Sequence, residues 1–115
     1  TVVEDNPKDP NYAPLQENLK RLKAMTIENG EPLNVLPLPM PRKFVVEDRR
    51  MAASYANFYI ANNVVLLPIY NQPSDKIATT TLEQCFPNRE IIGIDCCELI
   101  WVYGSIHFAT QQEPE

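Results

Sequence analysis

Apolar residues gather most densely in two adjacent runs, Ser54–Ala61 and Val64–Tyr70, which are separated only by Asn62-Asn63. Both runs are rich in aromatic and β-branched residues, which favour strands. Because asparagine tolerates positive φ, the Asn pair predicts a primed two-residue hairpin turn. The second run is apolar on both faces and therefore belongs inside a sheet, with Pro68 at a bulge or at the end of the strand.

A helical spacing of leucines precedes this hairpin. Leu15, Leu19 and Leu22 recur at intervals of four and three residues, which places them on one side of a helix. The pattern predicts an amphipathic helix over Ala13–Asn29 that covers a sheet, with Gly30 as its natural end.

A second helix is predicted after the hairpin, because the apolar spacing returns to the helical period. Ser74 is a candidate cap for its first turn, and Pro87 ends it. Its apolar face consists of Ile77, Ala78, Leu82, Cys85 and Phe86.

Shorter patterns fill the rest of the chain. Leu33–Leu38, Glu90–Asp95 and Ser105–Thr110 are predicted as strands, and Cys96–Trp101 as one turn of helix. The charged segment Arg42–Met51 is predicted as a loop or a short edge strand. From the hairpin onward the order is therefore strand, strand, helix, strand, strand, which indicates a mixed α/β fold.

Composition places the chain among ordinary globular proteins. It has 115 residues, 44% of them hydrophobic and 22% charged, so residues 1–115 form one domain or a piece of a larger one. Its net charge of −5 argues against nucleic acid or an anionic membrane as a partner. No apolar run approaches the roughly 20 residues that a membrane-spanning helix needs.

The cysteines favour a cytoplasmic location. There are three of them, Cys85, Cys96 and Cys97, and an odd number with an adjacent pair does not suggest a disulfide framework. One histidine and the absence of a CxxC pair argue against a zinc site, so we expect no metal and no other cofactor. Acidic neighbours oppose thiolate formation at the adjacent cysteines, so packing is favoured over catalysis for both.

Five longer segments of the sequence resemble a known family: DPNYAPLQENLKRLK, LNVLPLPMP, SYANFYIANNVVLLP, FPNREIIGID and GSIHFATQQEPE. Their order and spacing resemble the C-terminal third of agmatine deiminase, which is similar to the bacterial-type peptidyl-arginine deiminases. The resemblance implies a fragment of the pentein α/β propeller, in which five ββαβ units surround a central active site. This chain would hold one complete unit, residues 54–95, and parts of its two neighbours.

The resemblance also implies a chemistry. A cysteine thiolate attacks the guanidinium carbon, ammonia leaves, and water releases a urea-type product, while two acidic side chains hold the substrate and a histidine transfers protons. For agmatine the product would be N-carbamoylputrescine, on the route to putrescine.

The resemblance places the nucleophile of the family in a motif close to GGGSIHC followed by xTQQ. In this chain Phe108 stands at the cysteine position, and Val102 and Tyr103 stand where two glycines would admit a ligand. A phenyl ring cannot attack carbon. The proton-transferring histidine and the acidic pair of the family are expected before Thr1, and His107 is a different histidine.

A vestigial pocket is the remaining site hypothesis. Asn57 matches an active-site asparagine of the related peptidyl-arginine deiminases, but it could equally satisfy backbone groups in the strand. Trp101 and Tyr103 either fill the space left by the glycines or form an aromatic lid over a guanidinium or amine ligand. The candidate residues of the pocket are Asn57, Gly104, Ser105, His107, Trp101 and Tyr103.

Three functions are compatible with these observations. The chain is a non-catalytic, agmatine deiminase-like binding or assembly module, or a segment of a working agmatine deiminase, or a stand-alone interaction protein. A slice of a propeller leaves strand edges unpaired, so we expect a homo-oligomer joined through those edges.

Overall fold

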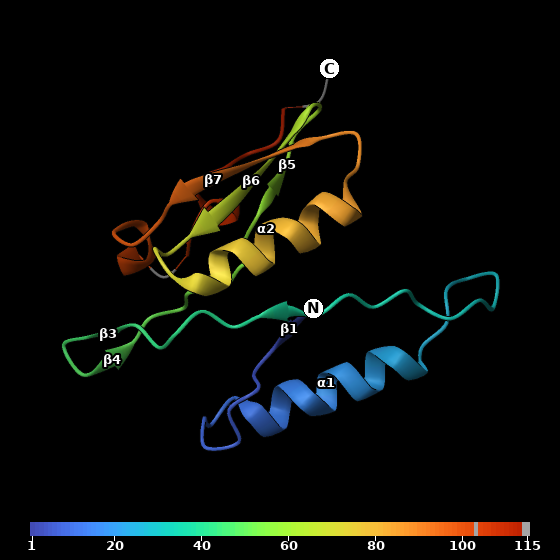
Figure 1. Cartoon of the computed structure of the whole chain (residues 1–115), viewed down its shortest axis with the longest axis horizontal. Helices are drawn as coiled ribbons and strands as arrows, with labels where there is room; N and C mark the ends of the chain where they lie inside the picture. The colour runs from blue at the N-terminus through green and yellow to red at the C-terminus, as the bar shows by residue number, and fades with distance from the viewer. Residues whose placement is uncertain (103, 114–115) are drawn as a thin grey trace.

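The computed structural model describes residues 1–102 and 104–113, which form a mixed α/β fold (Figure 1). Two helices, α1 and α2, carry the helical part of the fold, and the longest strands, β6 and β7, lie side by side in one sheet. The elements in chain order are β1 Val2–Val3, α1 Tyr12–Ala24, β2 Leu38–Pro39, β3 Val45–Val46, β4 Arg49–Arg50, β5 Tyr59–Ile60, β6 Val64–Ile69, α2 Pro73–Cys85, β7 Glu90–Asp95 and the 3₁₀ turns η1 Leu99–Val102 and η2 His107–Ala109.

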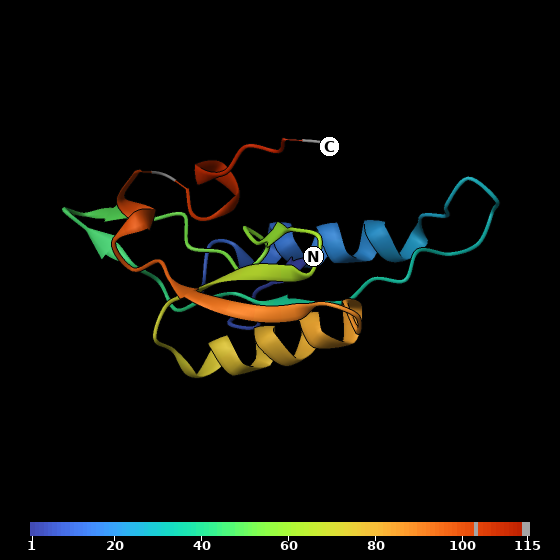
Figure 2. The ribbon, with the colours of Figure 1, turned by 90° about the horizontal axis from the view of Figure 1, so that it is seen from above.

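The central sheet has the strand order β5-β6-β7. β5 and β6 pair antiparallel, whereas β6 and β7 pair parallel and are joined through α2. Figure 2 shows α2 on one face of this sheet and the C-terminal segment on the other. The order β5, β6, α2, β7 is the strand-strand-helix-strand order expected for residues 54–95.

The core lies where α2 meets this sheet. Val65 and Leu67 of β6 are fully buried, and they belong to one cluster with Ala78 and Leu82 of α2. Ile77, which the apolar spacing also assigned to the buried face, is instead 58% exposed. The apolar face of α2 is therefore narrower than predicted.

Pro68 lies within β6 without disturbing it. The β6–β7 register continues unbroken from Val64 opposite Glu90 to Ile69 opposite Asp95, so there is no bulge at the proline. The Ala61 N–H bonds to the Val64 carbonyl, which shows that even-numbered residues of β6 direct their backbone groups toward β5. β5 pairs only as far as Leu66, so the donor that Pro68 lacks would have had no strand partner there.

The Asp75 carboxylate joins three separate segments of this fold. It accepts hydrogen bonds from the Tyr55 hydroxyl (2.6 Å), the Tyr70 backbone N–H (3.0 Å) and the Gln72 backbone N–H (2.9 Å). Ser74, the predicted cap, instead lies with its hydroxyl 2.7 Å from the Tyr55 hydroxyl, and the N-cap residue of α2 is Gln72. The start of α2 is thereby fixed to the end of β6 and to the segment before β5.

Helix α1 is shorter than its leucine spacing predicted. It ends at Ala24 rather than Asn29, because residues 26–32 form a tight loop in which the Ile27 N–H bonds to the Glu31 carbonyl. Gly30 has φ +86° in this loop, so it serves the turn and does not end the helix. α1 buries no residue fully, and it lies beside the two-stranded β1–β2 sheet.

Two predicted strands are also shorter in the structure. Of Leu33–Leu38 only Leu38 is in a strand, β2, which pairs with β1, because neighbouring prolines supply no donors for a longer ladder. Of Ser54–Ala61 only β5 pairs with β6, since the Asn57 N–H bonds back to the Ser54 carbonyl in a turn.

The predicted hairpin with the Asn62-Asn63 link is present as β5–β6, but its turn is not of the primed kind, and a primed turn occurs in another hairpin. Among the described non-glycine residues, positive φ occurs at Glu47, Asp48 and Asn71, and not at Asn62-Asn63. Glu47 and Asp48, with φ of 49° and 61°, form the two-residue link between β3 and β4. The charged segment Arg42–Met51 therefore contains a hairpin, whose turn is the primed kind that matches strand twist.

The predicted strand Ser105–Thr110 is a 3₁₀ turn. The Ala109 N–H lies within hydrogen-bonding distance of the Ser105 (3.2 Å) and Ile106 (3.0 Å) carbonyls, and η2 covers His107–Ala109. Alternation alone cannot make a strand without a neighbour to pair with, and the central sheet of the described chain ends at β5 and β7. The helical turn predicted at Cys96–Trp101 is present as η1, shifted toward the C-terminus.

No helix in the described ranges combines the length and the apolar character needed to cross a bilayer. The expected cytoplasmic location stays a prediction.

Replacing Asp75 by asparagine is expected to lower the free energy of unfolding by about 1–3 kcal/mol, because one carboxylate now satisfies several donors and an amide supplies a single acceptor oxygen. Urea unfolding followed by circular dichroism measures this. Glu83→Gln, an exposed carboxylate on the same helix, is the matched control and should leave the midpoint within error. Equal effects of the two substitutions would contradict the central role of Asp75.

The unfolding free energy is expected to fall as the pH rises above about 10. Burial, and then the hydrogen bond to Asp75, raise the pKa of Tyr55, and burial raises the pKa of Tyr70. Unfolded tyrosines therefore lose their protons first, so stability is complete below their ordinary pKa and declines above it. Tyr55→Phe should flatten this decline between pH 9 and 11 in urea titrations, and an unchanged slope would contradict the argument.

Candidate functional site

Phe108 occupies the position where the resemblance places a nucleophilic cysteine. It lies in η2 with 76% of its surface exposed, and its ring stands edge-on to the His107 ring, with the centroids 5.8 Å apart. A Cβ placed on Gly104 would lie 2.7 Å from the Phe108 Cβ. Gly104 is therefore needed for the close turn that carries Phe108, whatever its role toward a ligand.

Ser105 is fully buried and faces Tyr70. Burial raises the pKa of Tyr70, and the nearby Ser105 hydroxyl opposes that effect. The Ser105 Oγ nevertheless forms no hydrogen bond with any residue that the structure describes. The Tyr70 hydroxyl instead donates to the Ser54 carbonyl at 3.2 Å, so Ser105 packs against a structural tyrosine.

Asn57 and His107 are brought together by the backbone. The His107 N–H donates to the Asn57 carbonyl at 3.2 Å, and the Asn57 side chain is half-buried. His107 borders a hollow of about 280 Å³ between the C-terminal segment and the start of β5. Its lining consists of Ala56, Phe58, Tyr59, Ile60, His107 and Gln112.

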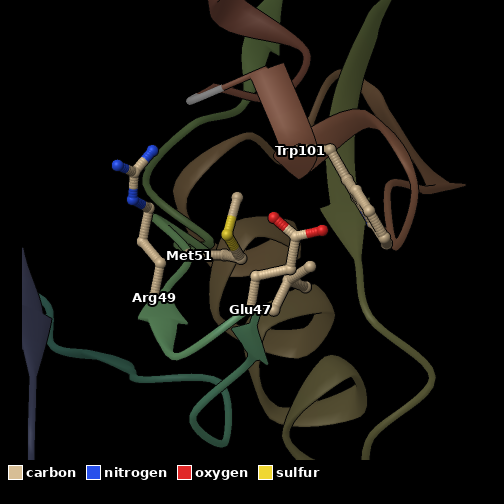
Figure 3. Close-up of a pocket in the computed structure, with 5 residues that line it drawn as sticks. Glu47, Arg49, Met51 and Trp101 are labelled. Carbon is tan, nitrogen blue, oxygen red and sulfur yellow. The ribbon is translucent and has the colours of Figure 1, made fainter.

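Trp101 lies at a different hollow, of about 240 Å³, between η1 and the β3–β4 hairpin (Figure 3). In this view the Glu47 carboxylate lies between Met51 and the Trp101 ring, and the Arg49 guanidinium is directed to the opposite side. The hollow is lined by Val46, Glu47, Arg49, Met51 and Trp101, and Trp101 is 57% exposed. A carboxylate beside an exposed indole face suits a planar or compact cation.

The predicted pocket residues therefore do not share one hollow. Trp101 and His107 border different hollows, and Gly104 and Ser105 are buried. Tyr103 lies outside the described residues. Sequence reasoning missed Glu47, and the signal that could have found it is the acidic pair at the centre of a hairpin within Arg42–Met51.

The surroundings of the adjacent cysteines, Cys96 and Cys97, disfavour the thiolate form. Burial and then the Asp95 charge raise the pKa of Cys96, and burial and then the hydrogen bond to Asp95 raise the pKa of Cys97. A raised thiol pKa leaves less of the nucleophilic form at neutral pH. Within the described residues no three His, Cys, Asp or Glu side chains gather closely enough to hold a metal ion.

Comparison with protein families matches residues 1–114 to the Porphyromonas-type peptidyl-arginine deiminases. A curated protein of Marinomonas sp., which carries the provisional name agmatine deiminase, is 35% identical over 100% of this chain and 36% of its own length. A protein of Lactococcus lactis with the same provisional name is 32% identical over 99% of this chain and 36% of its own length.

Solved structures give the same relationship. A provisionally named arginine deiminase from Porphyromonas gingivalis superposes with a TM-score of 0.95 at 38% identity, covering 99% of this chain and 34% of that one. The agmatine deiminase of Enterococcus faecalis superposes with a TM-score of 0.88 at 30% identity, covering 99% of this chain and 36% of that one.

This chain spans about a third of the length of the curated relatives it matches, since 35–36% of each is covered. The similarity extends through nearly every residue and includes the turn that carries Phe108. The chain accordingly belongs to the family of Porphyromonas-type peptidyl-arginine deiminases.

Proposed function

We propose that this chain is an agmatine deiminase-like module that has no guanidine-hydrolysing activity on its own and acts in binding or assembly. The observation that carries this proposal is Phe108 at the position of the nucleophile. Its phenyl ring offers neither a lone pair nor an acidic proton, so it cannot form the covalent intermediate through which the family's chemistry proceeds.

The other thiols of the chain do not replace the missing one. Cys96 is fully buried, and the pKa values of both Cys96 and Cys97 are raised, so little thiolate forms at neutral pH. Cys85 lies at the C-terminal end of α2 and is half-buried. These environments support a structural role for all three residues.

In architecture, the proposal makes the chain a fragment of the pentein propeller. The ββαβ order of β5, β6, α2 and β7 supports one complete unit, and the remaining elements would belong to its neighbours. The proposal also assigns the protein to the cytoplasm.

A second candidate function is a segment of a working agmatine deiminase, which would convert agmatine into N-carbamoylputrescine for polyamine synthesis. The coverage favours it, because the chain matches about 36% of relatives with that name. In this case another polypeptide would have to supply a thiol near the exposed ring of Phe108.

The hollow beside Trp101 supports binding of a guanidinium or amine ligand. Glu47, whose carboxylate supplies negative charge, and Trp101, which supplies an aromatic face, both line it, while the Arg49 guanidinium is directed to the other side (Figure 3). Binding there needs no catalytic group, so it is compatible with a non-catalytic module.

No ammonia release is expected from agmatine, arginine or a peptidyl-arginine substrate, either with the chain as it stands or with Phe108→Cys. The substituted thiol would lack the acidic pair and the proton-transferring histidine that the chemistry requires. A coupled ammonia assay at high protein concentration measures this. Turnover that disappears in Cys96→Ser or Cys97→Ser would contradict the proposal.

Methylguanidinium is expected to change the emission of Trp101 in a saturable way, whereas the uncharged methylurea should not. Trp101 is the single tryptophan of the chain and lines this hollow, so its fluorescence is a local probe of it. Glu47→Gln should weaken the apparent affinity about twofold to fivefold, since an exposed ion pair contributes up to about 1 kcal/mol.

Asp48→Asn is the matched control for that titration, because it removes one charge from the same turn without changing a residue that lines the hollow. Equal weakening by the two substitutions would show that the ligand senses net charge and not the Glu47 carboxylate. A linear response to methylguanidinium would also contradict a binding site.

A further inference from the structure

The outer edge of β7 is open. In the described part of the chain β7 has a strand neighbour on one side only, β6. Ile92 and Ile94 of β7 are 37% and 38% exposed. The strand contains no lysine, no proline and no interruption of its register, and its only charged residues, Glu90 and Asp95, lie at its two ends. The middle of the strand therefore lacks the devices by which natural sheets keep an edge from pairing.

The backbone groups on this edge can be assigned from the bonds on the other side. The Glu90 N–H donates to the Asn63 carbonyl, and the Cys96 N–H donates to the Ile69 carbonyl. Backbone direction alternates along a strand, so even-numbered residues of β7 face β6. Ile91, Gly93 and Asp95 therefore direct their N–H and C=O groups outward.

The three residues with outward backbone groups, Ile91, Gly93 and Asp95, are spaced symmetrically about Gly93. We propose that two copies of the chain pair through β7, antiparallel, about a two-fold axis at Gly93, an inference that rests on the assembly role proposed above. In this register Gly93 pairs with its own counterpart, and Ile91 pairs with Asp95 of the second copy. Every outward N–H and C=O of β7 then has a partner.

Side chains support the same register. The side chains of Ile92 and Ile94 lie on the same face of β7. In this register Ile92 lies opposite Ile94 of the second copy, and the two-fold axis repeats the contact. Both exposed isoleucines of each chain are thereby covered. Glu90 lies opposite Cys96 and Asp95 opposite Ile91, so no two acidic side chains face each other. A shift by one residue would place Glu90 opposite Asp95, and each outward-facing residue would then lie opposite a residue whose own N–H and C=O face β6.

A second copy is the occupant that this edge favours, because its hydrogen-bonding pattern is complementary to itself. Pairing of this kind is isologous and closes after two chains, since each β7 has a single open edge. The expected assembly is therefore a dimer with one continuous sheet in the order β5-β6-β7-β7-β6-β5.

Light scattering with the full chain tests the dimer. The wild-type chain should be dimeric at about 100 µM, and Ile92→Lys and Ile94→Lys should each weaken association at least tenfold, because each places two lysines beside the axis. Ile77→Lys is the matched control, since Ile77 is an isoleucine with 58% exposure on α2, and it should leave association unchanged. Circular dichroism verifies that all variants fold.

Cysteine cross-linking tests the register, in a Cys85→Ser, Cys97→Ser background. When differently tagged Ile92→Cys and Ile94→Cys chains are mixed and oxidised, the cross-linked product should join one chain of each kind. Positions 92 and 94 form the non-hydrogen-bonded pair, in which Cβ atoms are close enough for a disulfide. Each variant alone should give at most a tenth of that product.

A monomeric wild-type chain would overturn the inference, and so would a dimer that is weakened equally by Ile77→Lys or that cross-links equally well in unmixed samples. None of these results bears on the ammonia assay. The two proposals can therefore fail separately. Scattering and cross-linking test the β7 dimer, whereas only ammonia release would contradict the non-catalytic assignment.

Discussion

The fold depends on one partly buried carboxylate, that of Asp75, more than on any other polar group that the structure describes. Asp75 receives the Tyr55 hydroxyl at 2.6 Å, and it also satisfies the N–H groups of Tyr70 and Gln72 at the end of β6. Burying the hydroxyl of Tyr55, which is 0% exposed, would be costly without such an acceptor. This network fixes where the β6–α2 connection turns, and the direction of α2 then lets β7 return parallel to β6.

Sequence reasoning predicted the elements whose apolar pattern is long and is backed by their neighbours. The boundaries of β7 were predicted correctly, and α2 was recognised from its spacing and from Pro87. Errors arose where pairing decides the outcome: Ser105–Thr110 alternates like a strand but has no neighbour within the described sheet, and Leu33–Leu38 is interrupted by proline. Local pattern cannot reveal whether a partner strand exists.

The candidate site was predictable only in part for a related reason. The family resemblance singled out Phe108, because a motif is local in sequence, but it did not reveal that this segment is a 3₁₀ turn and not a strand. The hollow beside Trp101 is formed by the β3–β4 hairpin, about fifty residues earlier in the chain, and Glu47 reaches it only because a primed turn places two acidic residues at positive φ. Arg42–Met51 was predicted as a loop or a short edge strand, and neither structure predicts that Glu47 lies near Trp101.

This fold accommodates a phenylalanine at position 108 because the core is built from other residues. The Phe108 ring is 76% exposed, so the core around Val65, Leu67, Ala78 and Leu82 does not require a particular side chain there. Gly104, in contrast, is constrained by the closeness of the Phe108 Cβ, and that constraint would hold equally for a cysteine Cβ. The same turn can therefore carry either a phenylalanine or a cysteine at position 108, so the geometry of the backbone there does not depend on the chemistry of that side chain.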